Sequence, residues 1–272
     1  MSAPILPLVV EPEELEAALG REGLLVVDLS KPELHAQLHV PGAVHLDYAR
    51  IVAARKPVAG LLPEADALGT ALATVGITPA THVVAYDDEG GGKACRLLWT
   101  LDVLGHRGFS LLNGGLHAWA NERHRAESGM TPPTPAPRYP VTYRDEGRAD
   151  ADYIRAHLDD RGVRLLDARS PEEYQGFKRL AARAGHIPGA VNLEWTRAMD
   201  PNRNLRLRAE PELRAMLEAI GIDPTHEVIT YCQSHHRSAH TYIMLKSLGF
   251  ERVRGYPGSW SDWGNRDDTP IE

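Results

Sequence analysis

The octapeptide His-Val-Pro-Gly-Ala-Val-His-Leu at residues 39–46 returns as His-Ile-Pro-Gly-Ala-Val-Asn-Leu at residues 186–193. Four further pairs of segments repeat in the same order, namely 23–28 with 162–167, 75–79 with 220–224, 82–86 with 226–231, and 114–119 with 258–263. A repeat unit of this length is a whole domain, since the units of solenoid proteins are far shorter. The chain is therefore a tandem duplication of one domain.

A proline-rich segment separates the two copies. Five prolines lie between Thr131 and Pro140, and proline continues neither a helix nor a central strand. We expect one domain at residues 1–125, a linker at residues 126–141 and a second domain at residues 142–272. The total of 272 residues agrees with two domains, because a typical domain has about 150 residues.

Within each copy, short apolar runs alternate with amphipathic segments. The expected strands are residues 24–27, 83–86, 109–112, 165–166, 228–231 and 252–255. The expected helices include residues 94–104, 211–220 and 239–248. This alternation predicts an α/β fold in which two tandem domains each have a parallel sheet covered by helices on both faces. Ligands of such sheets bind beyond the carboxyl ends of the strands, so a catalytic loop should directly follow a strand.

Composition and charge exclude several classes of protein. The chain is 43% hydrophobic and 25% charged, which is typical of a globular protein. Its net charge of −7 argues against a nucleic-acid partner. Two cysteines do not make a disulfide framework, and no apolar run approaches the length of a membrane-spanning helix. The first basic residue is Arg21, so a signal peptide is not expected either. We expect a cytoplasmic monomer.

The loop after the strand that ends at Tyr231 contains the candidate catalytic residues. They are Cys232, Gln233, Ser234, His235, His236 and Arg237. A thiol between a strand and a helix lies near unpaired N–H groups and the positive end of the helix dipole, and adjacent cations lower its pKa further. The same N–H groups form an anion-binding cup. The run of polar residues argues against a buried cysteine that only fills the core. We expect a nucleophilic cysteine and a substrate-binding loop.

The equivalent loop of the first copy has different chemistry. It reads Asp-Asp-Glu-Gly-Gly-Gly-Lys at residues 87–93 and contains no nucleophile. Three carboxylates would repel an anion, so we expect this copy to be inactive. Cys95 lies inside the helical pattern that follows, where a cysteine is typically a small core residue.

The duplicated halves, the segment 185–190, the Cys232 loop and the segment 256–263 resemble a two-domain rhodanese, a sulfurtransferase. The resemblance covers nearly the whole chain, and the loop is similar to a variant found in some bacterial thiosulfate sulfurtransferases. It implies an inactive N-terminal domain and a C-terminal domain whose cysteine becomes a persulfide. The implied reaction moves sulfane sulfur from thiosulfate, or a related donor, to cyanide or a thiol, including that of a thioredoxin-like protein. Neither a metal nor an organic cofactor is expected.

The sequence departs from this family at Glu173, six residues after Asp167. Family members tend to place a substrate-binding arginine there, and we expect the glutamate to disfavour carboxylate donors by repulsion. Lys178, Arg179 and Arg183 lie in an eight-residue insertion that the first copy lacks. They either replace the missing arginine or form a solvated basic face.

Two other functions remain open from the residues alone. A thiolate in a cup that ends in arginine also suits a cysteine phosphatase or arsenate reductase. Four residues separate Cys232 from Arg237, whereas the related phosphatases have five, and the tighter cup favours a single sulfur atom. A metal-binding module is the third hypothesis, because Cys232, His235, His236 and His240 cluster in the sequence. The paired Cys-x-x-Cys ligands common in zinc sites are absent from this sequence.

Overall fold

Two compact units make up the chain in the computed structural model, which describes residues 4–130 and 132–272. Unit 1 comprises Met1–Ile51, Pro63–Tyr143 and Asp200–Leu207, and unit 2 comprises Val52–Leu62, Arg144–Met199 and Arg208–Glu272. Each unit thus includes a short segment from the other half of the sequence. Residues 1–3, in the predicted first domain, and Thr131, in the predicted linker, lie outside the described residues.

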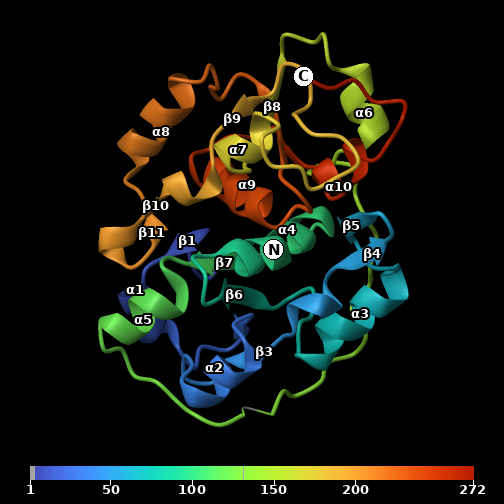
Figure 1. Ribbon diagram of the computed structural model, residues 1–272. Coiled ribbons are helices and arrows are strands. Elements are labelled where there is room, and N and C mark those ends of the chain that lie inside the picture. Colours follow the sequence, from blue (N-terminus) through green and yellow to red (C-terminus); the bar gives the residue numbers. More distant parts are fainter. Residues whose placement is uncertain (1–3, 131) are drawn as a thin grey trace. The chain divides into compact units, whose positions relative to one another are not determined.

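Unit 1 is built on a parallel five-stranded sheet of order β1-β7-β6-β2-β3 (Figure 1). Its strands are β1 (Val9–Val10), β2 (Leu24–Asp28), β3 (Val44–His45), β6 (His82–Tyr86) and β7 (Phe109–Leu112). Its helices are α1 (Pro12–Ala18), α2 (Pro32–Gln37), η1 (Tyr48–Arg50), α3 (Ala65–Thr74), α4 (Gly92–Val103), α5 (Gly115–Asn121) and η3 (Pro201–Arg203).

Helices cover both faces of this sheet. Val84 of β6 packs in one hydrophobic cluster with Leu15 of α1 and Trp119 of α5. Successive side chains of a strand point to opposite faces, so the buried residues Val83 and Ala85 face the other side. That side is covered by α4, which contacts β6 and β7. The predicted sheet with helices on both faces is confirmed for this unit.

Unit 2 repeats the arrangement with a parallel four-stranded sheet of order β13-β12-β8-β9. Its strands are β8 (Val163–Asp167), β9 (Val191–Asn192), β12 (Glu227–Tyr231) and β13 (Val253–Gly255). Its helices are α6 (Ala151–Ala156), α7 (Pro171–Tyr174), η2 (Trp195–Ala198), α8 (Glu210–Glu218), α9 (Arg237–Ser247) and α10 (Ser259–Trp263). Residues of α6 and α10 share a hydrophobic cluster with β8 and β12, and α9 contacts β12 and β13.

Two short pairs of strands complete the fold. An antiparallel hairpin, β4 (Ala53–Arg55) and β5 (Val58–Leu61), comes from the N-terminal half of the sequence and belongs to unit 2. Strands β10 (Met199–Asp200) and β11 (Arg206–Leu207) form the other pair. Among the described residues, no helix combines the length and apolar character needed to cross a membrane.

The strand register places the two candidate loops in equivalent positions. In unit 1, Asp28 of β2 pairs with Tyr86 of β6, and in unit 2, Asp167 of β8 pairs with Tyr231 of β12. These are the last residues of their strands. The chain that follows each tyrosine therefore leaves the sheet at its carboxyl edge, as we expected for a catalytic loop.

Candidate active site

Hydrogen bonds from α10 and the residues before it hold the loop after β12 in place. The hydroxyl of Ser259 accepts from the backbone N–H of Cys232 at 3.2 Å and of His235 at 3.1 Å, and it donates to the carbonyl of Tyr256 at 2.7 Å. The N–H groups of Trp260 and Ser261 donate to the carbonyls of Cys232 and Gln233. Both ends of the turn at Cys232–His235 are thus fixed by one short helix.

The hairpin of β4 and β5 packs against the same loop within unit 2. The N–H of Ala59 donates to Ser261 Oγ at 2.9 Å. Gly60, with a φ of 74°, lies so close to the loop that a Cβ atom there would be 2.0 Å from the carbonyl oxygen of Ser234. Only glycine allows this approach of the two backbones.

Cys232 is buried, with 1% of its surface exposed, and so is His235. The polar run of the loop therefore does not keep these two side chains exposed. Hydrogen bonding explains the difference, because a buried polar group is tolerated when it has a partner. His235 Nδ1 lies 2.8 Å from Ser238 Oγ. Gln233, Ser234, His236 and Arg237 are each partly exposed.

The surroundings of Cys232 favour its thiolate. Burial raises the pKa of this thiol, but the charge of Arg237 and hydrogen bonds from the hydroxyl and N–H of Ser238 and the N–H of Ser234 outweigh it and lower the pKa below the ordinary value. Cys95 in α4 differs, because burial and the charge of Asp87 raise its pKa well above the ordinary value. The two cysteines thus have opposite tendencies to ionise.

Arg237 is the first residue of α9 and forms a two-point ion pair with Glu173 of α7. Its terminal nitrogens Nη1 and Nη2 donate to the carboxylate oxygens at 2.6 and 2.9 Å. Glu173 is 2% exposed, and its pKa, which burial raises, is brought below the ordinary value mainly by Arg237. Arg237 therefore compensates the charge that we expected to repel a carboxylate donor.

A second buried ion pair extends this arrangement. Arg169 binds Asp167 through Nε and Nη2 at 2.6–3.0 Å, and both residues are buried. The charge of Arg169 also acts on Glu173. Anions and cations therefore alternate from Asp167 through Arg169, Glu173 and Arg237 to the sulfur of Cys232, and we call these five residues the charge series.

The first copy has the same turn but fills it with its own carboxylate. Asp87 Oδ1 accepts from the N–H of Glu89 at 3.0 Å and of Gly91 at 2.8 Å, and Oδ2 accepts from the N–H of Ala94 at 2.9 Å. Burial and the charge of Glu89 raise the pKa of Asp87 against these hydrogen bonds. The Asp87 carboxylate therefore occupies the anion-binding cup of the first copy. From the sequence we expected only that the carboxylates of this loop repel an anion.

The first copy also lacks most of the charge series. Ser30, Leu34 and Gly92 stand where the second copy has Arg169, Glu173 and Arg237. Asp28, the counterpart of Asp167, contacts His35 Nδ1 at 2.8 Å instead of an arginine. This difference between the copies was visible in the sequence, and it would have marked Arg169 as part of the site.

The three cations of the insertion do not act together. Arg183 donates to backbone carbonyls of Trp263, Arg266 and Thr269, so it holds the C-terminal segment in place. Lys178 and Arg179 are exposed, as a solvated basic face would have them. The contacts of Arg183 thus support a structural role for this residue.

The metal-binding hypothesis finds no support at the loop. Within the described ranges, no three of Cys232, His235, His236 and His240 bring their ligand atoms within 4.8 Å of one another. The rings of His236 and His240 lie against Trp195. Burial and the charge of His236 lower the pKa of His240 to about 4. These histidines pack against an aromatic ring.

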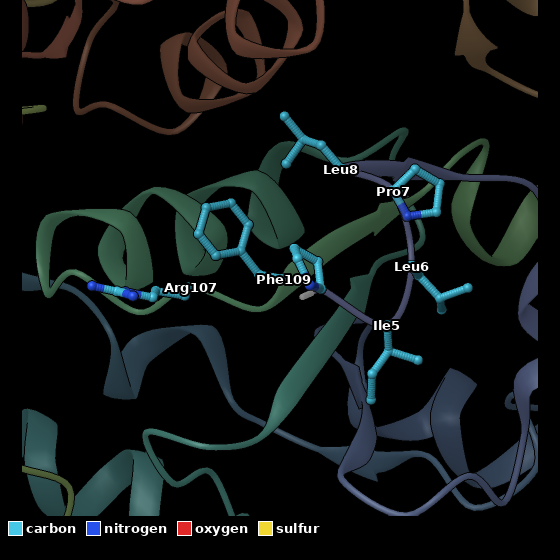
Figure 2. A pocket seen from close by; sticks show the side chains of 7 residues that line it. Ile5, Leu6, Pro7, Leu8, Arg107 and Phe109 are labelled. Carbon is cyan, nitrogen blue, oxygen red and sulfur yellow. The ribbon is translucent and has the colours of Figure 1, made fainter. Parts of the chain in front are cut away.

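The pocket in Figure 2 lies in unit 1, and none of its lining residues belongs to either loop. It has a volume of about 440 Å³ and is lined by residues 4–8 together with Arg107 and Phe109. Phe109 begins β7, so the pocket is at the amino end of this strand, whereas the candidate loops follow the carboxyl ends. No cysteine or histidine lines it.

Comparison with known proteins agrees with this geometry. The Rhodanese-like domain matches the chain twice, at residues 11–122 and at residues 150–266. The chain belongs to the rhodanese family.

Thiosulfate sulfurtransferases are similar to this chain over nearly their whole length, and a solved structure shares its fold. A thiosulfate sulfurtransferase of Pseudomonas aeruginosa is 46% identical, and the match covers 98% of this chain and 97% of the relative. A thiosulfate sulfurtransferase of Azotobacter vinelandii is 45% identical over the same shares. An anaerobic ergothioneine biosynthesis enzyme from Chlorobium limicola shares the fold, with a TM-score of 0.86 and 23% identity over 97% of this chain and 70% of that one.

The two thiols should differ in their reaction with iodoacetamide. We expect Cys232 in the native protein to be alkylated with a pH midpoint below the ordinary thiol value of about 8.5, because its folded pKa is lowered. Reactivity should therefore be kept as pH falls towards neutrality and lost only below the lowered pKa. Cys95 should stay unmodified over the same range. Peptide mass spectrometry after timed alkylation measures both, and a midpoint for Cys232 above that of free cysteine would contradict the proposed electrostatics.

Proposed function

We propose that the chain is a thiosulfate sulfurtransferase that carries sulfane sulfur on Cys232. The observation that carries the proposal is the position of this thiol in the turn between β12 and α9, among N–H donors and a cation that favour its ionised form. The names of the relatives from Pseudomonas aeruginosa and Azotobacter vinelandii support the donor.

The reaction proceeds in two balanced transfers. The Cys232 thiolate attacks the outer sulfur of thiosulfate, an S–S bond forms to the enzyme, and the original S–S bond breaks with its electron pair leaving on sulfite. The enzyme then holds an anionic persulfide. Cyanide or a thiolate attacks the outer sulfur, becomes thiocyanate or a new persulfide, and returns the cysteine as thiolate. This covalent scheme predicts ping-pong kinetics.

The loop residues stabilise the sulfur anion in both states. The N–H groups of Ser234 and Ser238 and the hydroxyl of Ser238 donate towards it, and Arg237 adds positive charge. His235 orients the Ser238 hydroxyl through their 2.8 Å contact. Gln233 and His236 are the partly exposed members of the binding loop. Fixed donors of this kind cost little reorganisation when charge moves during the reaction.

The proposal assigns catalysis to the domain of residues 142–272. The domain of residues 1–125, joined to it by the linker at residues 126–141, is proposed to be inactive. We place the enzyme in the cytoplasm, where a reducing environment keeps Cys95 and Cys232 as the free thiols found here. It works as a monomer, and its acceptors include cyanide, small thiols and a thioredoxin-like protein.

Replacement of each cysteine by serine tests the assignment. In Cys232→Ser, thiocyanate formation from thiosulfate and cyanide should fall more than about a thousandfold, as when other enzymes lose their nucleophile. Cys95→Ser should keep activity within about twofold, since this thiol is buried and its pKa is raised. Equal losses of thiocyanate formation in the two variants would contradict the assignment of Cys232 as the sulfur carrier. Faster hydrolysis of an aryl phosphate than formation of thiocyanate, in the wild type, would favour the phosphatase.

The preference between sulfur donors is a separate prediction. Its physical reason is the pairing of Glu173 with Arg237 and no longer repulsion by a free carboxylate. Thiosulfate should have a kcat/KM at least about tenfold above that of 3-mercaptopyruvate. Glu173 already binds both terminal nitrogens of Arg237, so this arginine is not available to pair with a donor carboxylate. Steady-state rates with the two donors at one concentration of cyanide measure the ratio. A preference for 3-mercaptopyruvate would show that another cation binds the carboxylate.

A further inference from the structure

The guanidinium of Arg237 has two anionic neighbours that compete for it. Glu173 takes both terminal nitrogens at 2.6 and 2.9 Å. The charge of the same group lowers the pKa of Cys232, and the sulfur accepts hydrogen bonds from Ser234 and Ser238. The cation is therefore oriented by the carboxylate and acts on the sulfur across space.

We propose that Glu173 is a positioning residue that holds the Arg237 guanidinium away from a direct hydrogen bond to the sulfur on Cys232. This inference rests on the proposed sulfur transfer and concerns the same site. A sulfur anion in direct contact with a guanidinium is stabilised as an ion pair, and a more stabilised thiolate is a weaker nucleophile. Glu173 thus keeps the sulfur charged but reactive.

The comparison of the two copies supports a role in the reaction over a role in folding. The first copy arranges its strands β7-β6-β2-β3 in the order of β13-β12-β8-β9 in the second copy, and it forms the equivalent turn with Leu34 and Gly92 in place of Glu173 and Arg237. The fold therefore does not require this ion pair. A buried carboxylate is also costly to keep ionised unless it is paired, and it occurs in the copy that carries the thiol.

The other charged and titratable groups around Cys232 leave Arg237 as the cation that matters. Arg169 is bound to Asp167 on β8, and burial first, with the charge of Asp167, raises the pKa of Tyr231 well above its ordinary range. His235 is bonded to Ser238, and His240 has its pKa lowered to about 4. Changes at Glu173 should therefore reach the sulfur through Arg237.

The test is Glu173→Gln, with Glu172→Gln as the matched control. Both remove one negative charge from α7, but Glu172 is exposed whereas Glu173 is buried against Arg237. In Glu173→Gln the released guanidinium should move onto the sulfur. The pH midpoint for alkylation of Cys232 should shift to lower pH. The rate at its high-pH plateau should fall about two- to threefold for each pH unit of that shift, as a Brønsted coefficient of about 0.4–0.5 implies.

Steady-state kinetics should show a split between KM and kcat. In Glu173→Gln the KM for thiosulfate should fall several-fold, because the site gains net positive charge, while kcat falls with the nucleophilicity of the thiolate. Glu172→Gln should match the wild type in every measurement. Glu173→Asp, which keeps the charge, should restore the wild-type pH midpoint.

A double substitution shows whether Glu173 acts on the Cys232 sulfur through Arg237 or directly through its own charge. In an Arg237→Gln background, adding Glu173→Gln should leave the alkylation midpoint nearly unchanged, and melting temperatures show whether each variant is folded. A midpoint that moves to higher pH or stays fixed in Glu173→Gln would overturn the proposal, as would an equal shift in the Arg237→Gln background. Alkylation needs no turnover, so absence of thiocyanate formation by the wild type would instead refute the proposed function.

Discussion

The turn from a central strand into the following helix leaves backbone N–H groups that converge on one point, and this constraint governs both units. A helix begins there with unpaired N–H donors, so the convergent point favours a negative charge. In unit 1 the carboxylate of Asp87 occupies it, and in unit 2 the sulfur of Cys232 does. One scaffold thus places an acidic side chain at the same point in both units, a carboxyl group in the first and a thiol in the second.

What distinguishes the second unit is the charge series that leads to its sulfur. Asp167, Arg169, Glu173 and Arg237 are ionised side chains whose charges cancel in pairs. Removing one partner of the Asp167–Arg169 pair, in which both side chains are buried, would cost about 3–5 kcal/mol because the remaining charge is unpaired. The sequence retains two such pairs beside Cys232, where the first copy manages without three of the four residues. Of the four, Arg237 has a charge that lowers the pKa of the Cys232 thiol.

The internal repeat explains why so much of the fold was predictable. Strand and helix positions read from one copy could be checked against the other, and each expected strand overlaps an observed one. The prediction that Cys232 directly follows a strand, in a loop at the carboxyl edge of the sheet, came from the same pattern. Spacing along the chain did not reveal the pairing of Glu173 with Arg237, because 64 residues separate them. It also did not reveal that the hairpin of β4 and β5, which comes from the N-terminal half of the sequence, belongs to unit 2. Gly60 of this hairpin packs against the loop after β12 through tertiary contacts.

The central claim is that the loop after β12 carries sulfur on Cys232, and the mass of the protein tests it most directly. Protein incubated with thiosulfate and freed of small molecules without reductant should gain about 32 Da as a persulfide. Peptide mapping should place the added mass on Cys232, and cyanide should remove it as thiocyanate. An unchanged mass, or a sulfur found on Cys95, would contradict the account.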